Sequence, residues 1–245
     1  MPVLVVDTDP QASVSKNFLG AAAVERLRPH ESIAALFDAR REPEADSLIH
    51  PTGIDNIRLL PASDYLEAYD LPRPQKLGDI AFALRDFLDE VLESFGLVLI
   101  DTPPAVSNLP AWSSLLAADY VVTPVTPEKN SSESVLDVKA RIAAALEHGN
   151  PDLVDLGFLV NNMDRRRATH RAVEIKLRQL YGSQVFEAVV PSRVAYVEAP
   201  YQLMPITHLA PKSEEADLIR SVLDELIRRI NAADALLGHQ LAEAG

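Results

Sequence analysis

The stretch Val3-Leu4-Val5-Val6-Asp7-Thr8-Asp9-Pro10-Gln11 decides the fold, because a short apolar run ends there in two carboxylates. Four apolar residues in a row are typical of a strand buried on both faces, as in parallel sheets. Side chains at positions i and i+2 share a face, so Asp7 and Asp9 are expected to point the same way. They would do so at the carboxyl end of the strand, where open α/β sheets bind ligands. The alternative is a solvated acidic turn that only closes the strand.

A second run of the same kind ends in a third acid. Leu97-Val98-Leu99-Ile100 leads into Asp101, and the prolines that follow prevent the strand from continuing. An aspartate at such an edge commonly orients the water shell of Mg²⁺ beside a nucleotide phosphate, because Mg²⁺ keeps most of its waters. The sequence therefore predicts that three carboxylates meet at one sheet edge.

The rest of the chain alternates short apolar runs with amphipathic segments, which favours an α/β fold with helices on both faces of a mostly parallel sheet. The clearest helix is predicted over residues 76–95, where apolar residues recur at three- and four-residue steps. Residues 38–52 and 64–76, rich in proline and acids, are expected to be surface connections. A chain of 245 residues is predicted to form one domain over 1–245. Further strands are expected near 121–125, 156–161 and 184–190, and further helices near 131–148, 169–181 and from 213.

Composition narrows the functional classes. The 36 acidic and 23 basic side chains give a net charge of −13, which disfavours nonspecific binding to phosphate groups overall. The absence of cysteine excludes disulfides, and no apolar run or leader predicts membrane insertion or export, so a cytoplasmic location is expected. Two local sets of basic residues could still form patches, although a solvated helix face is the default interpretation. They are Arg165, Arg166, Arg167, Arg171, Lys176 and Arg178, and Arg220, Arg228 and Arg229.

In this order along the chain, the motifs resemble the ParA branch of the ParA/MinD group of deviant Walker ATPases, which has a P-loop NTPase-like fold. The resemblance implies a protein that partitions plasmids, chromosomes or cargo, and that binds and hydrolyses ATP with Mg²⁺. It also implies a homodimer, a DNA-bound ParB-like partner protein and, through local arginine patches, nonspecific DNA binding. No membrane anchor of the MinD type is matched. Five collinear pieces carry the resemblance: Val-Asp-Thr-Asp-Pro-Gln at 6–11, Leu-Ile-Asp-Thr-Pro-Pro at 99–104, and residues 57–63, 121–125 and 189–200.

One defining element of that family is not found in these 245 residues. A ParA protein opens with a strand and a Gly-rich Lys-Thr phosphate loop, whereas here Met1 and Pro2 lead directly into the strand that carries Asp7. We therefore expect a ParA-like domain that is incomplete at its N-terminus by roughly 30 residues, the length of a βαβ unit. We also expect this chain by itself not to hydrolyse ATP. In the family the missing strand lies beside the strand at 97–101, so an unpaired sheet edge is expected there.

The resemblance also implies roles for individual residues. Asp9 would position or activate the attacking water, and Asp7 and Asp101 would support Mg²⁺. Asn161 would hydrogen-bond adenine from the end of its strand, although an asparagine there often caps the next turn instead. The segment that would flank the base consists of Pro191, Ser192 and Arg193.

Two alternatives remain open. The first is a non-hydrolysing pseudo-ATPase or adaptor with the same fold. The second is a haloacid-dehalogenase-like phosphotransferase, in which Asp7 would attack phosphorus and Asp9 would move the proton. The second fits less well, because the nearest match to that group's second acidic motif, Asp79 with Asp86, falls inside the predicted helix.

Overall fold

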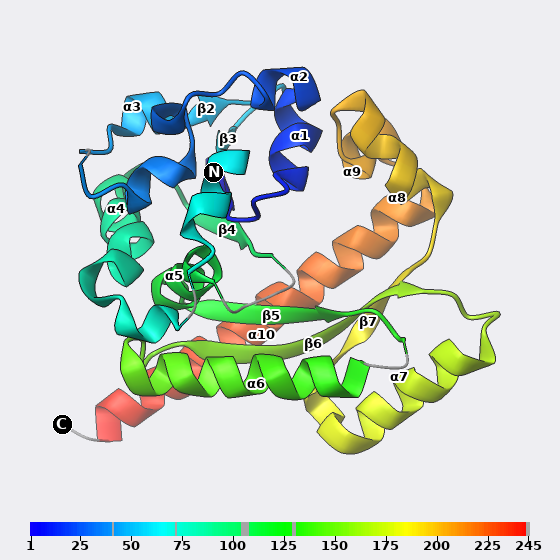
Figure 1. Cartoon of the computed structure of the whole chain (residues 1–245). Coiled ribbons are helices and arrows are strands. Elements are labelled where there is room, and N and C mark those ends of the chain that lie inside the picture. The colour runs from blue at the N-terminus through cyan, green and yellow to red at the C-terminus, as the bar shows by residue number, and fades with distance from the viewer. Residues whose placement is uncertain (41, 72, 104–107, 129–130, 244–245) are drawn as a thin grey trace. The chain divides into compact units, whose positions relative to one another are not determined.

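The computed structural model describes residues 1–40, 42–71, 73–103, 108–128 and 131–243 (Figure 1). The chain forms two compact units. The first unit comprises Met1–Ala118, Ala144–Pro151 and Pro200–Met204, and the second comprises Asp119–Ala143, Asp152–Ala199 and Pro205–Gly245. Each unit contains its own sheet, and the α/β class with mostly parallel strands is confirmed. The single domain over 1–245 stays a prediction.

The sheet of the first unit has the order β2-β3-β1-β4. Its strands are β1 (Val3–Asp7), β2 (His50–Pro51), β3 (Ile57–Leu60) and β4 (Leu97–Asp101). The central strand β1 runs parallel to β3 and β4, with Val3 opposite Leu97 and Asp7 opposite Asp101. The carboxyl ends of β1 and β4 therefore coincide, as the two sequence motifs predict.

The two edges of this sheet differ. The edge at β3 is covered by the short antiparallel β2, in which Pro51 has no N–H group to offer a further strand. At the other edge β4 pairs only with β1 among the described residues. Leu97 and Leu99 of β4 are 36% and 46% exposed. The unpaired edge expected at this strand is therefore present.

The helical segments of the first unit are shorter than predicted. Only Ala83–Val91 of the expected helix 76–95 is α-helical, because Gly78 adopts a left-handed φ of 68° and the flanking turns are 3-10. The segments expected as surface connections contain turns anchored by Leu48 and Leu66, both fully buried. The helices are α1 (Ser13–Leu19), α2 (Ala21–Val24), α3 (Ala45–Leu48), α4 (Ala83–Val91) and α5 (Leu109–Ala117), with 3-10 turns at Pro29–Glu31, Ile33–Phe37, Asp64–Tyr69, Pro74–Lys76, Gly78–Phe82 and Leu92–Ser94.

The second unit is a three-stranded parallel sheet between helices. Its strands β5 (Tyr120–Val125), β6 (Val154–Met163) and β7 (Val185–Pro191) are neighbours in that order. Figure 1 shows α6 and α7 on one face and α10 on the other. Val135 of α6 and Leu177 of α7 pack on the sheet with Phe158. The helices are α6 (Ser131–His148), α7 (Ala168–Tyr181), α8 (Val194–Glu198), α9 (Ile206–Leu209) and α10 (Glu214–Glu243), with 3-10 turns at Gly182–Gln184 and Ala199–Gln202. None of the described helices is both long and apolar enough to cross a membrane.

An ion pair on α10 fastens this helix to β7. The buried Glu225 carboxylate accepts the N–H groups of Glu187 at 2.9 Å and Ala188 at 2.8 Å. Burial raises the pKa of Glu225, but these hydrogen bonds and Arg229 outweigh it and leave the pKa lowered. Arg229 also donates to the carbonyl of Val185 at 3.2 Å. Arg229 is therefore a structural cation and not part of a free basic patch.

The close approach of β6 to the backbone of Gln184 depends on Gly157. Gly157 has a φ of +103°, and a Cβ there would lie 1.9 Å from the carbonyl oxygen of Gln184. Gly157→Ala is expected to lower the free energy of unfolding by about 3 kcal/mol, since both backbones must shift. Gly53→Ala is the control, because its Cβ would meet no atom within 4 Å. Urea unfolding midpoints measure both; equal midpoints for the two variants would contradict the close approach.

Candidate functional site at the ends of β1 and β4

Asp7 is the fixed point of the site. Its side chain is fully buried, and Oδ2 accepts the Ser15 N–H at 2.8 Å and the Ser15 hydroxyl at 2.7 Å. Oδ1 accepts the Asp9 N–H at 3.1 Å. The Ser15 hydroxyl in turn accepts the N–H of Ala62 at 2.9 Å. Burial raises the pKa of Asp7 although the hydrogen bonds from Ser15 oppose it. Asp7 thus ties α1 and the segment after β3 to the end of β1.

Asp9 lies in a turn and not on the strand. Because β1 ends at Asp7, the i, i+2 argument that placed both acids on one strand face does not reach Asp9. Its Oδ1 accepts the Gln11 N–H at 2.9 Å, and its carbonyl accepts the Ala12 N–H at 2.8 Å. Asp9 lines a hollow of about 570 Å³ whose described walls carry three carboxylates and no basic side chain. The other lining residues are Pro10, Gln11, Glu67, Asp70, Pro103 and Asn108.

Asp101 supplies the third acid from the end of β4. Its carbonyl accepts both the N–H of Thr8 at 2.9 Å and the hydroxyl of Thr8 at 2.8 Å, which locks β4 to β1. Within the described parts of the chain, no group donates to its carboxylate. Partial burial and the negative charges of Asp7 and Asp9 raise the pKa of Asp101 to about 6. The structure therefore brings the three predicted acids together; Pro104, which ends the second motif, lies outside the described residues.

This arrangement fits a hydrated cation better than a directly bound one. In the described residues no three acids or histidines lie in positions to hold a metal ion directly. Asp7 has both oxygens engaged, whereas the Asp101 carboxylate is free and repelled by its neighbours. Mg²⁺ keeps several waters and needs only one or two carboxylates, so Asp101 could hold it through water. These metal and catalytic roles remain predictions.

The residues predicted to surround adenine lie in the second unit. Asn161 is not at the end of its strand, because β6 continues to Met163. Its Oδ1 accepts the N–H of Asn162 at 2.9 Å, and Asn162 has a φ of 56°. Pro191 ends β7 opposite Met163, and the Ser192 N–H donates to the Met163 carbonyl at 2.9 Å. The two segments therefore meet at the carboxyl end of this sheet.

Arg193, the last residue of that loop, is held by acids of α10. Its guanidinium lies 3.0 Å from Glu214 and 3.8 Å from Glu215. The hydroxyl of Tyr196 donates to the Glu215 carbonyl at 3.0 Å. The loop after β7 is thus fastened to the first turn of α10, and the role of Arg193 beside a base remains a prediction.

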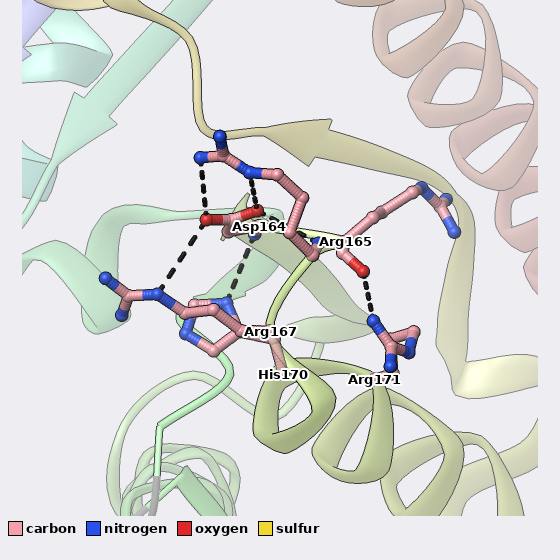
Figure 2. Close-up of polar contacts among 6 residues, drawn as sticks. Asp164, Arg165, Arg167, His170 and Arg171 are labelled. Carbon is pink, nitrogen blue, oxygen red and sulfur yellow. Dashed lines mark hydrogen bonds and ion pairs between the residues drawn. The ribbon is translucent and has the colours of Figure 1, made fainter.

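Sequence reasoning missed the residues that position the acids. Ser15 and Thr8 contribute no charge and match no catalytic pattern, yet they hold Asp7 and Asp101 in place. A small hydroxyl residue in the helix that follows a strand-end acid is the available signal. Asp164, which directly follows β6, was also missed. Its carboxylate accepts a hydrogen bond from Arg166 and forms an ion pair with Arg167 in the loop shown in Figure 2.

The raised pKa of Asp101 predicts a pH-dependent stability. Its folded-state value of about 6 exceeds the ordinary 3.8, so the folded state holds a proton that the unfolded state has released. Stability therefore falls as pH rises through this window. Asp101→Asn removes the penalty and is expected to stabilise the fold by about 1 kcal/mol near pH 8, a value reduced for solvent screening. The gain should vanish below pH 3.8.

Thermal unfolding across this pH range measures the difference between wild type and variant. Asp89→Asn, on the exposed face of α4, removes the same charge away from the acids and is the control. A gain for Asp101→Asn that does not change with pH would contradict the raised pKa of Asp101.

Comparison with known proteins agrees with this fold and motif order. Residues 1–154 match the family described as AAA domain. Over 231 residues the chain is 34% identical to the chromosome-partitioning ATPase Soj of Thermus thermophilus, covering 94% of this chain and 85% of that protein.

Two solved structures share the fold. Apo McdA from Cyanothece superimposes with a TM-score of 0.77 at 18% identity, covering 91% of this chain and 87% of McdA. Cobyrinic acid a,c-diamide synthase from Mycobacterium smegmatis, with bound ADP and magnesium, gives 0.73 at 24% identity, covering 94% and 83%. The family match and the Soj identity show that this chain belongs to the ParA/MinD family of P-loop ATPases.

Proposed function

We propose that the chain is a ParA-type partitioning protein that segregates a plasmid, a chromosome or another cargo. Together with a phosphate loop, which these 245 residues do not contain, it would bind and hydrolyse ATP with Mg²⁺. The observation that carries the proposal is the meeting of Asp7, Asp9 and Asp101 at the ends of β1 and β4. The 34% identity to a protein named chromosome-partitioning ATPase supports it.

Each acid has a distinct role in this proposal. Asp101 holds hydrated Mg²⁺, which when bound would neutralise charge on the transferred phosphoryl group. Asp9 lines the hollow and orients the attacking water. Asp7 stays in place as the buried anchor that sets the turn carrying Asp9. Asn161 and the loop of Pro191, Ser192 and Arg193 would border the adenine.

The partners proposed are a second copy of the chain, a ParB-like DNA-bound protein and DNA itself, in the cytoplasm. Among the described residues, ion pairs leave only Arg228 of the set on α10 without an acidic partner. Arg220 and Arg229 are paired with Asp217 and Glu225, and Arg178 is paired with Glu174. The loop after β6 keeps arginines without an acidic partner among the described residues, so we propose it as the DNA-facing patch.

A non-hydrolysing adaptor of the same fold is the second candidate. It is favoured by the lack of a Gly-rich Lys-Thr loop and by a hollow whose described walls are acidic, since three carboxylates repel a triphosphate. The haloacid-dehalogenase-like alternative fits the geometry poorly. Asp7 is fully buried and cannot reach a phosphorus atom, and Asp79 and Asp86 lie in helical turns, not at a strand end.

The nucleotide requirement can be tested by titration calorimetry. The 245-residue chain is expected to show no saturable binding of Mg-ATP in the micromolar range. A fusion that places the N-terminal segment of the Thermus relative ahead of Val3 is expected to bind and hydrolyse ATP. In that fusion Asp9→Ala should lower kcat by about 100-fold, the contribution of a positioned general base.

The matched control in the fusion is Asp70→Ala, which removes another carboxylate from the same hollow and should leave kcat within about threefold, as expected of a residue outside the proton transfer. Micromolar binding by the unfused chain would overturn the need for a phosphate loop. A fusion that binds ATP but never hydrolyses it would favour the adaptor.

A further inference from the structure

The segment Asp164–Arg171, hereafter the arginine loop, is the most basic part of an acidic protein. It joins β6 to α7 and contains four arginines and one aspartate, a net charge of +3 in a chain of −13. All four arginines are exposed. A focused positive patch of this kind attracts a polyanion even when the whole protein does not.

The four arginines fall into two pairs (Figure 2). Arg166 binds both carboxylate oxygens of Asp164 at 3.0 Å, and Arg167 lies 3.8 Å from the same carboxylate. These two charges lower the pKa of Asp164 to about 2, so it is ionised at any physiological pH. Arg166 and Arg167 therefore share one carboxylate within the loop, which engages both guanidinium groups and offsets one of their two charges.

The other two arginines have no acidic partner among the described residues. The guanidinium of Arg165 makes no hydrogen bond or ion pair with any of them, and Figure 2 shows its side chain extending away from Asp164. Among the described residues, the guanidinium of Arg171 donates only to the backbone carbonyl of Arg165. Each keeps N–H groups that can bind a phosphate in the two-point geometry that guanidinium favours.

The loop is held in shape before any partner arrives. The Asp164 N–H donates to Nδ1 of the buried His170 at 3.2 Å. The Arg166 N–H donates to the Asp164 carboxylate at 3.0 Å, and the Arg167 N–H to the Asp164 carbonyl at 3.1 Å. A pre-formed loop loses little conformational entropy on binding.

We propose that Asp164 takes the place of a phosphate inside the arginine loop and thereby limits its contact with DNA. While Asp164 occupies Arg166 and Arg167, only Arg165 and Arg171 remain to bind the phosphates of duplex DNA. The proposal rests on the DNA-handling function proposed above and adds the residue that sets its strength. Duplex DNA fits better than a lipid surface, because residues 164–171 contain no Leu, Ile, Val, Met, Phe, Tyr or Trp to enter a bilayer.

The two pairs differ in a measurable quantity, the salt dependence of binding. Each phosphate neutralised by an arginine contributes about 0.9 to the slope of log K against log salt on duplex DNA. The wild-type loop is expected to contribute a slope of about 1.8. Freeing Arg166 and Arg167 should double this slope. Raising salt from about 50 to 200 mM would then weaken binding roughly tenfold more than in wild type.

The first test uses Asp164→Asn and fluorescence anisotropy with a labelled mixed-sequence duplex. Asparagine keeps an acceptor for the Arg166 N–H but gives up the charge that holds the two guanidinium groups. The variant is expected to bind more tightly at low salt and with the steeper slope. Asp217→Asn is the control, since it makes the same charge change beside Arg220 on α10. A slope for Asp164→Asn no steeper than that of Asp217→Asn would overturn the proposal.

The second test leaves Asp164 intact and compares two double variants that each remove two arginines from the loop. R165Q/R171Q is expected to lower the slope by about 1.8, whereas R166Q/R167Q should leave it nearly unchanged. Equal losses for both would overturn the proposal even if Asp164→Asn failed to fold.

Two further outcomes separate the proposal from the function on which it rests. If neither wild type nor Asp164→Asn binds the duplex at low salt, the DNA-handling function is wrong. If Asp164→Asn strengthens binding to phosphatidylserine vesicles as much as binding to DNA, the loop recognises a membrane and the proposal is wrong. Tighter binding to the duplex alone supports it.

Discussion

The buried carboxylate of Asp7 is the interaction on which the rest of the candidate site depends. It ends the central strand β1 and accepts three hydrogen bonds, from both polar groups of Ser15 and from the N–H of Asp9. Unpaired, a buried carboxylate would cost several kcal/mol, so this position favours the one chain path that satisfies it. That path sets the start of α1, the turn of Asp9 and the segment after β3 at the same time.

The same burial concentrates negative charge where β1 and β4 end. Partial burial, together with the charges of Asp7 and Asp9, raises the pKa of Asp101 to about 6, so the folded protein keeps an electrostatic penalty at neutral pH. If packing alone determined the stability of the fold, replacing one of these acids by a neutral residue would raise the free energy of unfolding. Their presence at the ligand-binding edge of a parallel sheet is typical of a functional site.

The sequence was sufficient for the features that depend on local pattern. The apolar runs before Asp7 and Asp101 predicted two parallel strands and their shared edge, which the register confirms. The position of Asp9 could not be predicted, because β1 stops where Asp7 bonds to Ser15, eight residues further along. The break in the helix expected at 76–95 follows from the φ of Gly78, which apolar periodicity does not encode.

The arginine loop and Asn161 show the same limit for polar residues. The sequence identified Arg165 to Arg167 as a basic run. It could not show which of these arginines bind Asp164 and which point into solvent. That division depends on His170, which is buried and fixes the turn through the Asp164 N–H. Asn161 was placed at a strand end, whereas β6 runs on to Met163 because its pairing with β7 continues to Pro191.

The two edges of the first sheet differ in how they are protected from further pairing. Pro51 blunts one edge of the first sheet, because proline has no N–H group to offer a further strand. The described residues offer β4 no such protection, and its Leu97 and Leu99 remain exposed. A parallel strand added at β4 would bury these leucines. It would also end beside Asp101, because parallel strands bring their carboxyl ends to one edge.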